Sequence, residues 1–153
     1  MKLISFAIPC YNSAAYMRKC IESVLPGGDD VEIIIVDDGS VKDNTGEIAD
    51  EYAAKYPTIV KAVHQENGGH GQAVNTGLAN ATGKYFKVVD SDDWVDVTMY
   101  EKMYNKAIEE GSDIVVCDYV ETDGVSDKIV IEYNSCKNND FFHSVLTKKT
   151  HSS

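Results

Sequence analysis

Short apolar runs alternate along the chain with longer stretches in which apolar residues recur every three or four positions. The short runs predict β-strands at residues 3–8, 31–36, 59–63, 85–89, 114–119 and 128–133. The periodic stretches between them predict helices that begin near residues 13 and 44, after the glycine-rich turn at residues 67–71, and near residue 96. Nearly all-apolar strands that alternate with helices are typical of a mostly parallel sheet covered on both faces, so the expected fold class is α/β.

The starts and inner faces of the first helices can also be read from the sequence. Ser13 is a candidate N-cap for the first helix. The three- and four-residue spacing predicts that its inward stripe consists of Tyr16, Cys20, Ile21 and Val24. Asn44 and Glu47 have the spacing of a capping box for the second helix.

The predicted elements all fall within residues 1–133, which we expect to form one domain. Residues 134–153 are polar and lack a convincing period, so they are interpreted as a tail. No stretch reaches the length of a membrane span.

The charge balance restricts the partners. The 25 acidic and 14 basic residues give a net charge of -11, which argues against nucleic acid and against an anionic membrane surface. The 4 cysteines show neither a CxxC pair nor metal-ligand spacing, so we expect reduced, mostly buried thiols and a cytoplasmic location.

Polar residues follow the predicted strands at the points where these end. Because parallel strands of such a sheet end at one edge, residues just after them converge on one crevice. Here that edge collects Pro9, Tyr11, Asn12, Asp37, Asp38, Asp90, Asp92 and Asp93. Carboxylates gathered at one rim repel one another unless a cation intervenes, and oxygen ligands favour Mg²⁺ or Mn²⁺ over zinc.

Each of these features has a plainer explanation when it is taken alone. Residues 37–40 could form a turn, residues 90–93 could cap the following helix, and Gly68, Gly69 and Gly71 could serve a tight turn. His70 could be an ordinary surface histidine, and Trp94 is interpreted as a packing anchor beneath the loop. These explanations do not predict that all the features follow separate strands in this order.

Four segments together resemble the family 2 glycosyltransferases of the GT-A fold. They are Ile8–Asn12, Val36–Ser40, Asn67–Gly77 and Gly83–Trp94, and the resemblance covers roughly residues 3–110. It implies a Rossmann-like nucleotide-diphospho-sugar transferase fold. One position departs from the common pattern, because many members have Ala-Arg-Asn where this chain has Ala73, Val74 and Asn75.

The resemblance also implies roles for individual residues. Tyr11 matches the aromatic that stacks on a uracil-type base, Asp38 matches the carboxylate that binds the base ring, and Asp37 supports Asp38. Asp90 matches the acid that faces ribose or the donor sugar, and Asp92 matches the metal ligand. The implied donor-binding set is Pro9, Tyr11, Asn12, Asp37, Asp38, Gly69, Asp90 and Asp93.

The implied reaction moves a sugar from a nucleotide diphosphate, with UDP favoured, to a hydroxyl of a carbohydrate or lipid-linked acceptor. We expect it to need Mn²⁺ or Mg²⁺, to invert the anomeric centre and to serve polysaccharide or glycoconjugate synthesis. No motif matches the catalytic base, although Asp118 and Asp123 are available carboxylates. We therefore expect a donor-binding part truncated at its C-terminus, whose tail begins a missing acceptor-side region.

Three alternatives stay open. A magnesium-binding receiver domain would want a lysine after the strand at 114–119, where the chain has Val120 to Asp123. A nucleotidyltransferase would open with a glycine-rich basic loop, which Pro9 to Asn12 is not. A non-catalytic nucleotide-sugar-binding module fits the same motifs and differs only in lacking transfer.

Overall fold

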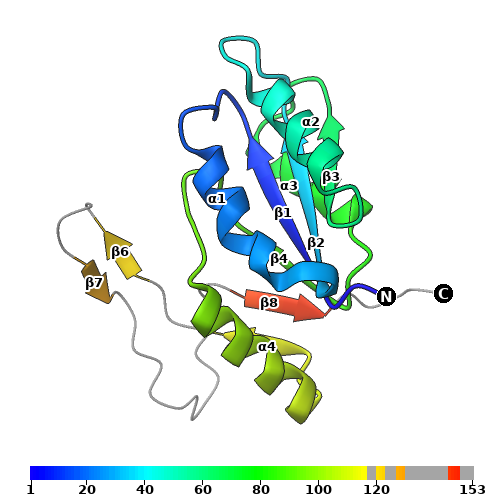
Figure 1. Ribbon diagram of the computed structural model, residues 1–153, viewed down its shortest axis with the longest axis vertical. Helices are drawn as coiled ribbons and strands as arrows, with labels where there is room; N and C mark the ends of the chain where they lie inside the picture. The colour runs from blue at the N-terminus through cyan, green and yellow to red at the C-terminus, as the bar shows by residue number, and fades with distance from the viewer. Residues whose placement is uncertain (117–119, 123–126, 130–144, 149–153) are drawn as a thin grey trace.

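A mostly parallel sheet with helices on both faces forms the body of the computed structural model, which describes residues 1–116, 120–122, 127–129 and 145–148 (Figure 1). In spatial order the strands are β3 Val60–His64, β2 Val31–Asp37, β1 Ile4–Cys10, β4 Tyr85–Val88, β8 Val145–Lys148 and β5 Ile114–Val116. The first four of these run parallel, whereas β8 pairs antiparallel with both neighbours. The predicted α/β class is confirmed.

The helices are α1 Met17–Val24, the 3₁₀ helix η1 Leu25–Asp30, α2 Thr45–Lys55, α3 His70–Asn80 and α4 Val97–Glu110. Figure 1 shows α1 and α2 in front of the sheet and α3 behind it. A separate antiparallel pair consists of β6 Val120–Thr122 and β7 Asp127–Ile129. None of the helices in these described segments is both long enough and apolar enough to cross a bilayer.

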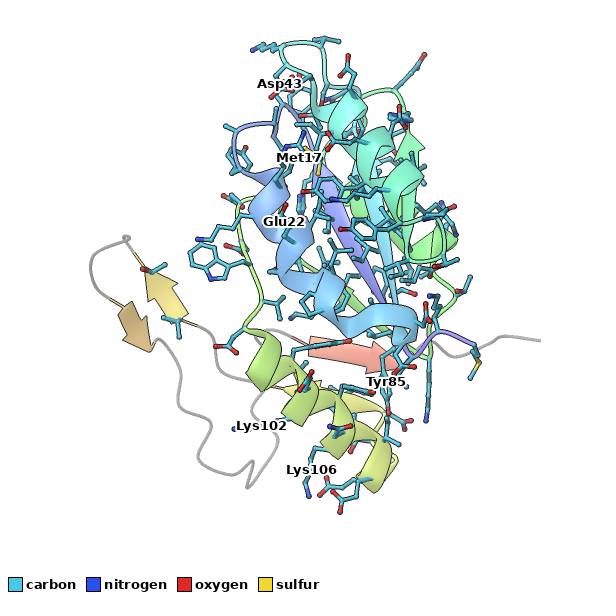
Figure 2. The ribbon with its side chains drawn as sticks, viewed as in Figure 1. Met17, Glu22, Asp43, Tyr85, Lys102 and Lys106 are labelled. Carbon is cyan, nitrogen blue, oxygen red and sulfur yellow. The ribbon has the colours of Figure 1, made fainter. Side chains whose placement is uncertain are left out.

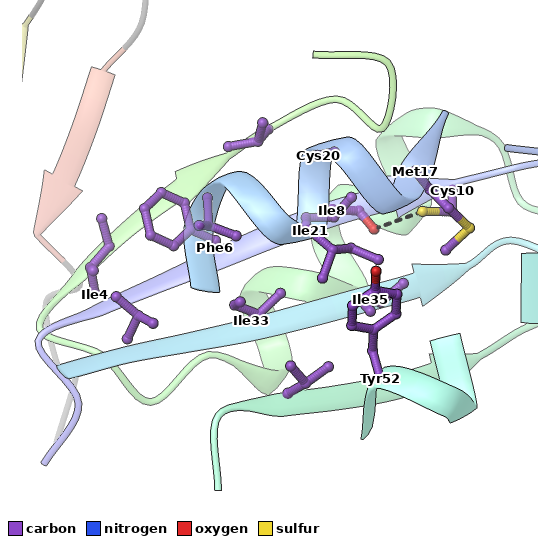
Figure 3. Close-up of a cluster of buried hydrophobic side chains, with 14 of the residues drawn as sticks. Ile4, Phe6, Ile8, Cys10, Met17, Cys20, Ile21, Ile33, Ile35 and Tyr52 are labelled. Atoms are coloured by element: carbon purple, nitrogen blue, oxygen red, sulfur yellow. Dashed lines mark hydrogen bonds between the residues drawn. The ribbon is translucent and has the colours of Figure 1, made fainter. Parts of the chain in front are cut away.

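The alternation of side chains along the central strands fills both faces of the sheet. Ile4, Phe6 and Ile8 of β1 point to the α1 face, as Figure 3 shows, and all three are buried. Ala7 lies between Phe6 and Ile8 in the chain and packs on the opposite face of the sheet with Ala73 of α3. Two buried faces explain why these strands are apolar at nearly every position.

Helix α1 buries a stripe that differs by one residue from the prediction. Met17 begins the buried set, followed by Cys20, Ile21 and Val24, whereas Tyr16 is 44% exposed. Ser13 is not the N-cap: Tyr16 occupies that position without a side-chain cap. The helix starts later than predicted because Ser13 lies in a turn, where its carbonyl accepts the amides of Tyr16 and Met17.

Helix α2 begins where the sequence predicts, but without the predicted capping box. Asn44 is the N-cap residue and makes no side-chain cap bond. The Asp43 carboxylate accepts hydrogen bonds from the Thr45 amide at 3.1 Å and the Thr45 hydroxyl at 2.7 Å. Asp43, labelled in Figure 2, is the residue before the N-cap, and its carboxylate therefore takes the place of the missing N-cap acceptor.

The C-terminal half contains a strand that the sequence analysis missed. Strand β8 falls within residues 134–153, where no regular element was expected, and it joins the main sheet between β4 and β5. Its Val-Leu-Thr-Lys sequence is too short to show a period, and its pairing partners are distant in the chain. Residues 117–119 and 130–133 of the predicted strands lie outside the described residues.

Helix α3 approaches β1 closely at Gly77, where an added Cβ would lie 2.6 Å from the Ala7 Cβ. We expect Gly77→Ala to lower the free energy of unfolding by about 1–3 kcal/mol, because α3 would have to move away from the sheet. Urea denaturation measures the change. Gly71→Ala in the same helix is the control, since no atom lies within 4 Å of its added Cβ. Equal stability of the two variants would contradict the close packing.

Candidate functional site

A pocket of about 510 Å³ lies where β1, β2 and β4 end and α3 begins. Its walls consist of Pro9, Cys10, Tyr11, Ser13, Tyr16, Asp38, Asn67, Gly69, His70, Ala73, Asp90, Ser91 and Asp92. The structure thus brings together Pro9, Tyr11, Asp38, Gly69, Asp90 and Asp92 from the predicted set. Asn12, Asp37 and Asp93 are close in sequence to the lining residues but are not among them.

Asp38 fixes the glycine-rich loop that forms one wall of the pocket. Its carboxylate accepts hydrogen bonds from the Gln65 amide group at 2.7 Å, the Gly68 backbone amide at 2.8 Å and the Gly69 backbone amide at 2.9 Å. Asp38 itself is only 3% exposed. A buried carboxylate with three donors is a fixed element of the wall, with a position set before any ligand enters.

Asp37 points into the protein beside Asp38 and supports the same turn. One carboxylate oxygen accepts the Ser40 amide at 3.0 Å, and the other lies 3.1 Å from Nδ1 of His64. The second ring nitrogen of His64 lies 2.9 Å from a carboxylate oxygen of Asp50 in α2. His64 therefore joins the end of β2 to α2 through two carboxylates.

These two carboxylates make stability depend on the charge of His64. Hydrogen bonds to Asp50 and then to Asp37 raise the pKa of His64 above its ordinary value of 6.5. A raised folded-state pKa contributes stability below about pH 6.5, and that contribution is lost as the pH rises through the folded-state pKa. We expect His64→Gln to destabilise the protein more at pH 6 than at pH 8 in urea denaturation. A pH-independent difference would contradict this linkage.

Asn12 ties the loop after β1 to the loop after β2. Its side-chain oxygen accepts the amides of Val41 at 3.2 Å and Lys42 at 3.0 Å, and its own amide donates to the Ser40 hydroxyl at 2.9 Å. Asn12 also has a φ of 50°, a left-handed conformation that asparagine tolerates better than most residues. These contacts give Asn12 a role in the shape of the loop.

The acidic loop after β4 is held against α1. The Asp90 carbonyl accepts a hydrogen bond from the Cys20 thiol at 3.4 Å, and the Ser13 and Ser91 hydroxyls lie 2.9 Å apart. Ser23 accepts the Val95 amide at 3.0 Å. The sequence analysis did not select Ser13 or Ser91 as pocket residues, because hydroxyl residues in loops carry no distinctive spacing.

The cysteines near this loop are protonated structural residues. Cys10 and Cys20 are buried free thiols, as predicted, and Figure 3 shows the hydrogen bond from Cys10 to the Ile8 carbonyl. Burial, followed by the negative charge of Asp93, raises the pKa of Cys20 to about 12. Neither nucleophilic nor metal-binding thiolate chemistry is favoured in such surroundings. Cys117 and Cys136 lie outside the described residues.

Asp90, Asp92 and Asp93 form an electrostatically strained group at the pocket rim. Partial burial, followed by the charges of Asp92 and Asp90, raises the pKa of Asp93. Across the described segments, no cluster of three or more His, Cys, Asp or Glu side chains is arranged to enclose a metal ion. The oxygen-only donor set nevertheless fits an ion such as Mg²⁺, which typically takes one or two protein carboxylates and completes its shell with water and phosphate.

Aromatic side chains lie on the side of the pocket next to α1. Tyr11 is 48% exposed and Tyr16 is 44% exposed, and both line the cavity. Trp94 is 46% exposed, with the Lys19 ammonium 3.2 Å from its ring centroid. The prediction that Trp94 is a packing anchor beneath the loop is therefore wrong: this large apolar ring is covered by a lysine instead of the core.

Comparisons with known proteins identify the family. The profile of Glycosyl transferase family 2 matches residues 5–151. The chain belongs to glycosyl transferase family 2. Glycosyltransferase GlyG of Streptococcus pneumoniae is 42% identical to this family 2 chain over 124 residues, which are 80% of the chain and 40% of GlyG. The uncharacterized glycosyltransferase EpsJ of Bacillus subtilis is 40% identical over 118 residues, covering 76% of the chain and 34% of EpsJ.

Solved structures agree with the GT-A fold of the family. S. aureus TarS 1–349 in complex with UDP is 30% identical with a TM-score of 0.66, covering 74% of this chain and 34% of TarS 1–349. The mannosyltransferase PcManGT from Pyrobaculum calidifontis, in complex with GDP-Man and Mn²⁺, is 26% identical with a TM-score of 0.54 and covers 60% and 28% of the two chains. The family 2 chain thus spans 40% or less of each of these four proteins.

Proposed function

We propose that this family 2 chain binds a nucleotide-diphosphate sugar in the pocket and provides the donor side of a glycosyl transfer to an acceptor hydroxyl. The observation that carries the proposal is the convergence of Tyr11, Asp38, Gly69, Asp90 and Asp92 on one cavity. These residues come from distant motifs of the chain and line a space of about 510 Å³, within the size range of small-molecule sites.

The nucleoside end of the donor occupies the region between Tyr11 and Asp38. The half-exposed ring of Tyr11 offers a face for stacking a base. Asp38 already binds three donors, so its remaining acceptor capacity orients the base ring against a wall held by these hydrogen bonds. A uracil-type base is favoured, in line with the UDP and UDP-GlcNAc complexes of TarS.

The diphosphate and donor sugar extend from there toward the acidic rim. Asp90 faces the ribose or the sugar, and Asp92 is the residue that would hold Mn²⁺ or Mg²⁺. When bound, such an ion supplies Lewis-acid stabilisation of the departing diphosphate. Asp93 stays out of the pocket lining and adds negative charge that attracts the cation. The Mn²⁺ in the PcManGT complex supports this assignment by analogy.

The acceptor is a carbohydrate or lipid-linked hydroxyl, and the transfer inverts the anomeric centre in the synthesis of a polysaccharide or glycoconjugate. The catalytic base is not assigned, since Asp118 and Asp123 lie outside the described residues. The donor side can be tested without knowing the acceptor.

Calorimetric titration of UDP, UDP-GlcNAc, GDP and GDP-mannose into the 153-residue chain tests the proposal, first with Mn²⁺ and then with a chelator. We expect saturable one-site binding of at least one of these ligands, weakened by the chelator. Absence of binding of all four in the presence of Mn²⁺ would contradict it.

A further inference from the structure

The pocket that would receive a diphosphate has an unusual charge balance. Three lining residues, Asp38, Asp90 and Asp92, carry carboxylates. Among the described residues that line it there is neither lysine nor arginine, and His70 is the single side chain able to carry positive charge. A diphosphate would add further negative charge to this space. Each positively charged or hydrogen-bond-donating group near the pocket therefore contributes to the affinity for the diphosphate.

His70 lines the pocket between the glycine-rich loop and the acidic loop after β4. It is the first residue of α3 and follows Gly69, whose amide is fixed by Asp38 at the nucleoside end. Its Nε2 lies 3.5 Å from a carboxylate oxygen of Asp90 at the acidic rim. The His70 side chain is 64% exposed and is therefore accessible to a ligand in the cavity.

The start of α3 adds to the attraction of an anion at this position. Gly69, the N-cap residue, has a φ of 84° and makes no side-chain cap bond. The first amides of a helix lack intrahelical acceptors and carry partial positive charge, which favours phosphate. His70 thus combines a side-chain donor with the backbone donors of the same helical turn.

We infer that His70 is a donor-binding residue that contacts the diphosphate of the nucleotide sugar, in addition to any metal ion held by Asp92. This inference rests on the proposed function, because it assigns a phosphate contact within the same pocket. One turn later in α3, Val74 is apolar and offers no hydrogen-bond donor, so His70 is the side chain of this helix in the pocket lining that can donate to a phosphate. The imidazole N–H donates to a phosphate oxygen.

The contact with Asp90 gives His70 a partner while no donor is bound. A 3.5 Å approach between exposed groups is weak, so a phosphate oxygen can replace Asp90 at little cost. The exchange frees the Asp90 carboxylate for the ribose or sugar hydroxyls at the moment when the donor arrives. His70 and Asp90 therefore change partners together when the ligand enters.

The test compares a nucleoside diphosphate with its own nucleoside, so that phosphate contacts are separated from base contacts. Calorimetry in Mn²⁺ gives the dissociation constants of UDP and uridine for the 153-residue wild-type chain and for His70→Ala, His70→Arg and Gln72→Ala. We expect His70→Ala to weaken UDP binding about tenfold and to leave uridine binding unchanged. His70→Arg should retain most of the affinity for UDP, because arginine also offers side-chain N–H donors to a phosphate.

Gln72→Ala is the matched control, since Gln72 is an exposed residue of the same helical turn outside the pocket lining. It should leave both constants unchanged. Unaltered UDP binding by His70→Ala, or equal weakening of UDP and uridine, would overturn the role of His70 while the proposed function stands. Failure of the wild-type chain to bind any of UDP, UDP-GlcNAc, GDP and GDP-mannose would instead overturn the proposed function and this inference with it. Thermal denaturation of each variant verifies folding.

Discussion

Replacing Asp92 with asparagine is expected to weaken the Mn²⁺-dependent binding of UDP by roughly 100-fold, because the cation would lose its carboxylate ligand in the pocket. The free energy of unfolding should not fall. Asp92 is exposed, and its charge raises the pKa of Asp93, so its neutralisation relieves repulsion within the folded rim. Calorimetry with and without chelator measures the first effect, and urea denaturation measures the second.

Asp29→Asn is the matched control for Asp92. Asp29 is exposed in η1, just before β2 begins and so away from the strand ends that form the pocket. It undergoes the same change of charge, so a general effect of the net charge on nucleotide affinity would appear in both variants. UDP binding that is equally strong in wild type and Asp92→Asn would exclude Asp92 as the metal ligand.

Replacing Asp38 with alanine is expected to affect both folding and binding. Three hydrogen bonds to a buried carboxylate would be lost, with partial replacement by water at the exposed Gly68 and Gly69 amides. We expect the free energy of unfolding to fall by about 2–3 kcal/mol and UDP binding to become undetectable. Urea denaturation and calorimetry on the same preparation measure the two effects.

Asp38 in the pocket wall and Asp92 at the rim are expected to differ in their effect on stability, because only Asp38 is buried and hydrogen-bonded to the glycine-rich loop. Asp38→Asn retains one oxygen acceptor and should lose less stability than Asp38→Ala, because the amides of Gly68 and Gly69 bond to different oxygens. Wild-type stability in Asp38→Ala would show that the glycine-rich loop does not depend on this carboxylate. Asp29→Ala supplies the surface reference, with an expected change within about 0.5 kcal/mol.

The convergence of the site could be predicted because it follows from the topology. Parallel strands end at one edge, so Pro9, Asp38 and Asp90 had to meet once β1, β2 and β4 were recognised. The strands themselves were recognisable because two buried faces leave a nearly continuous apolar run, as at residues 31–36, where Glu32 is the exception. Fold class and the position of the pocket therefore follow from hydrophobic pattern alone.

The direction of each side chain could not be predicted in the same way. Asp37 and Asp38 are adjacent, yet only Asp38 faces the cavity, since successive residues of an extended segment point to opposite sides. Asn12 was grouped with the ligand-binding residues, but its amide oxygen is bound to the backbone of the neighbouring loop. Tyr16 was expected on the buried face of α1, but it lies in the pocket wall because the N-cap of α1 is Tyr16 and not Ser13.

The bonds from Asp38 to Gly68 and Gly69 have a consequence for the kinetics of ligand entry. Because hydrogen bonds within the protein fix the shape of the loop, the entropy of ordering it is lost during folding and not when a nucleotide arrives. The two glycine amide protons should exchange with solvent more slowly than their exposed positions would otherwise allow. A nucleotide is then expected to reach this wall of the pocket without a separate kinetic phase for closure of the glycine-rich loop.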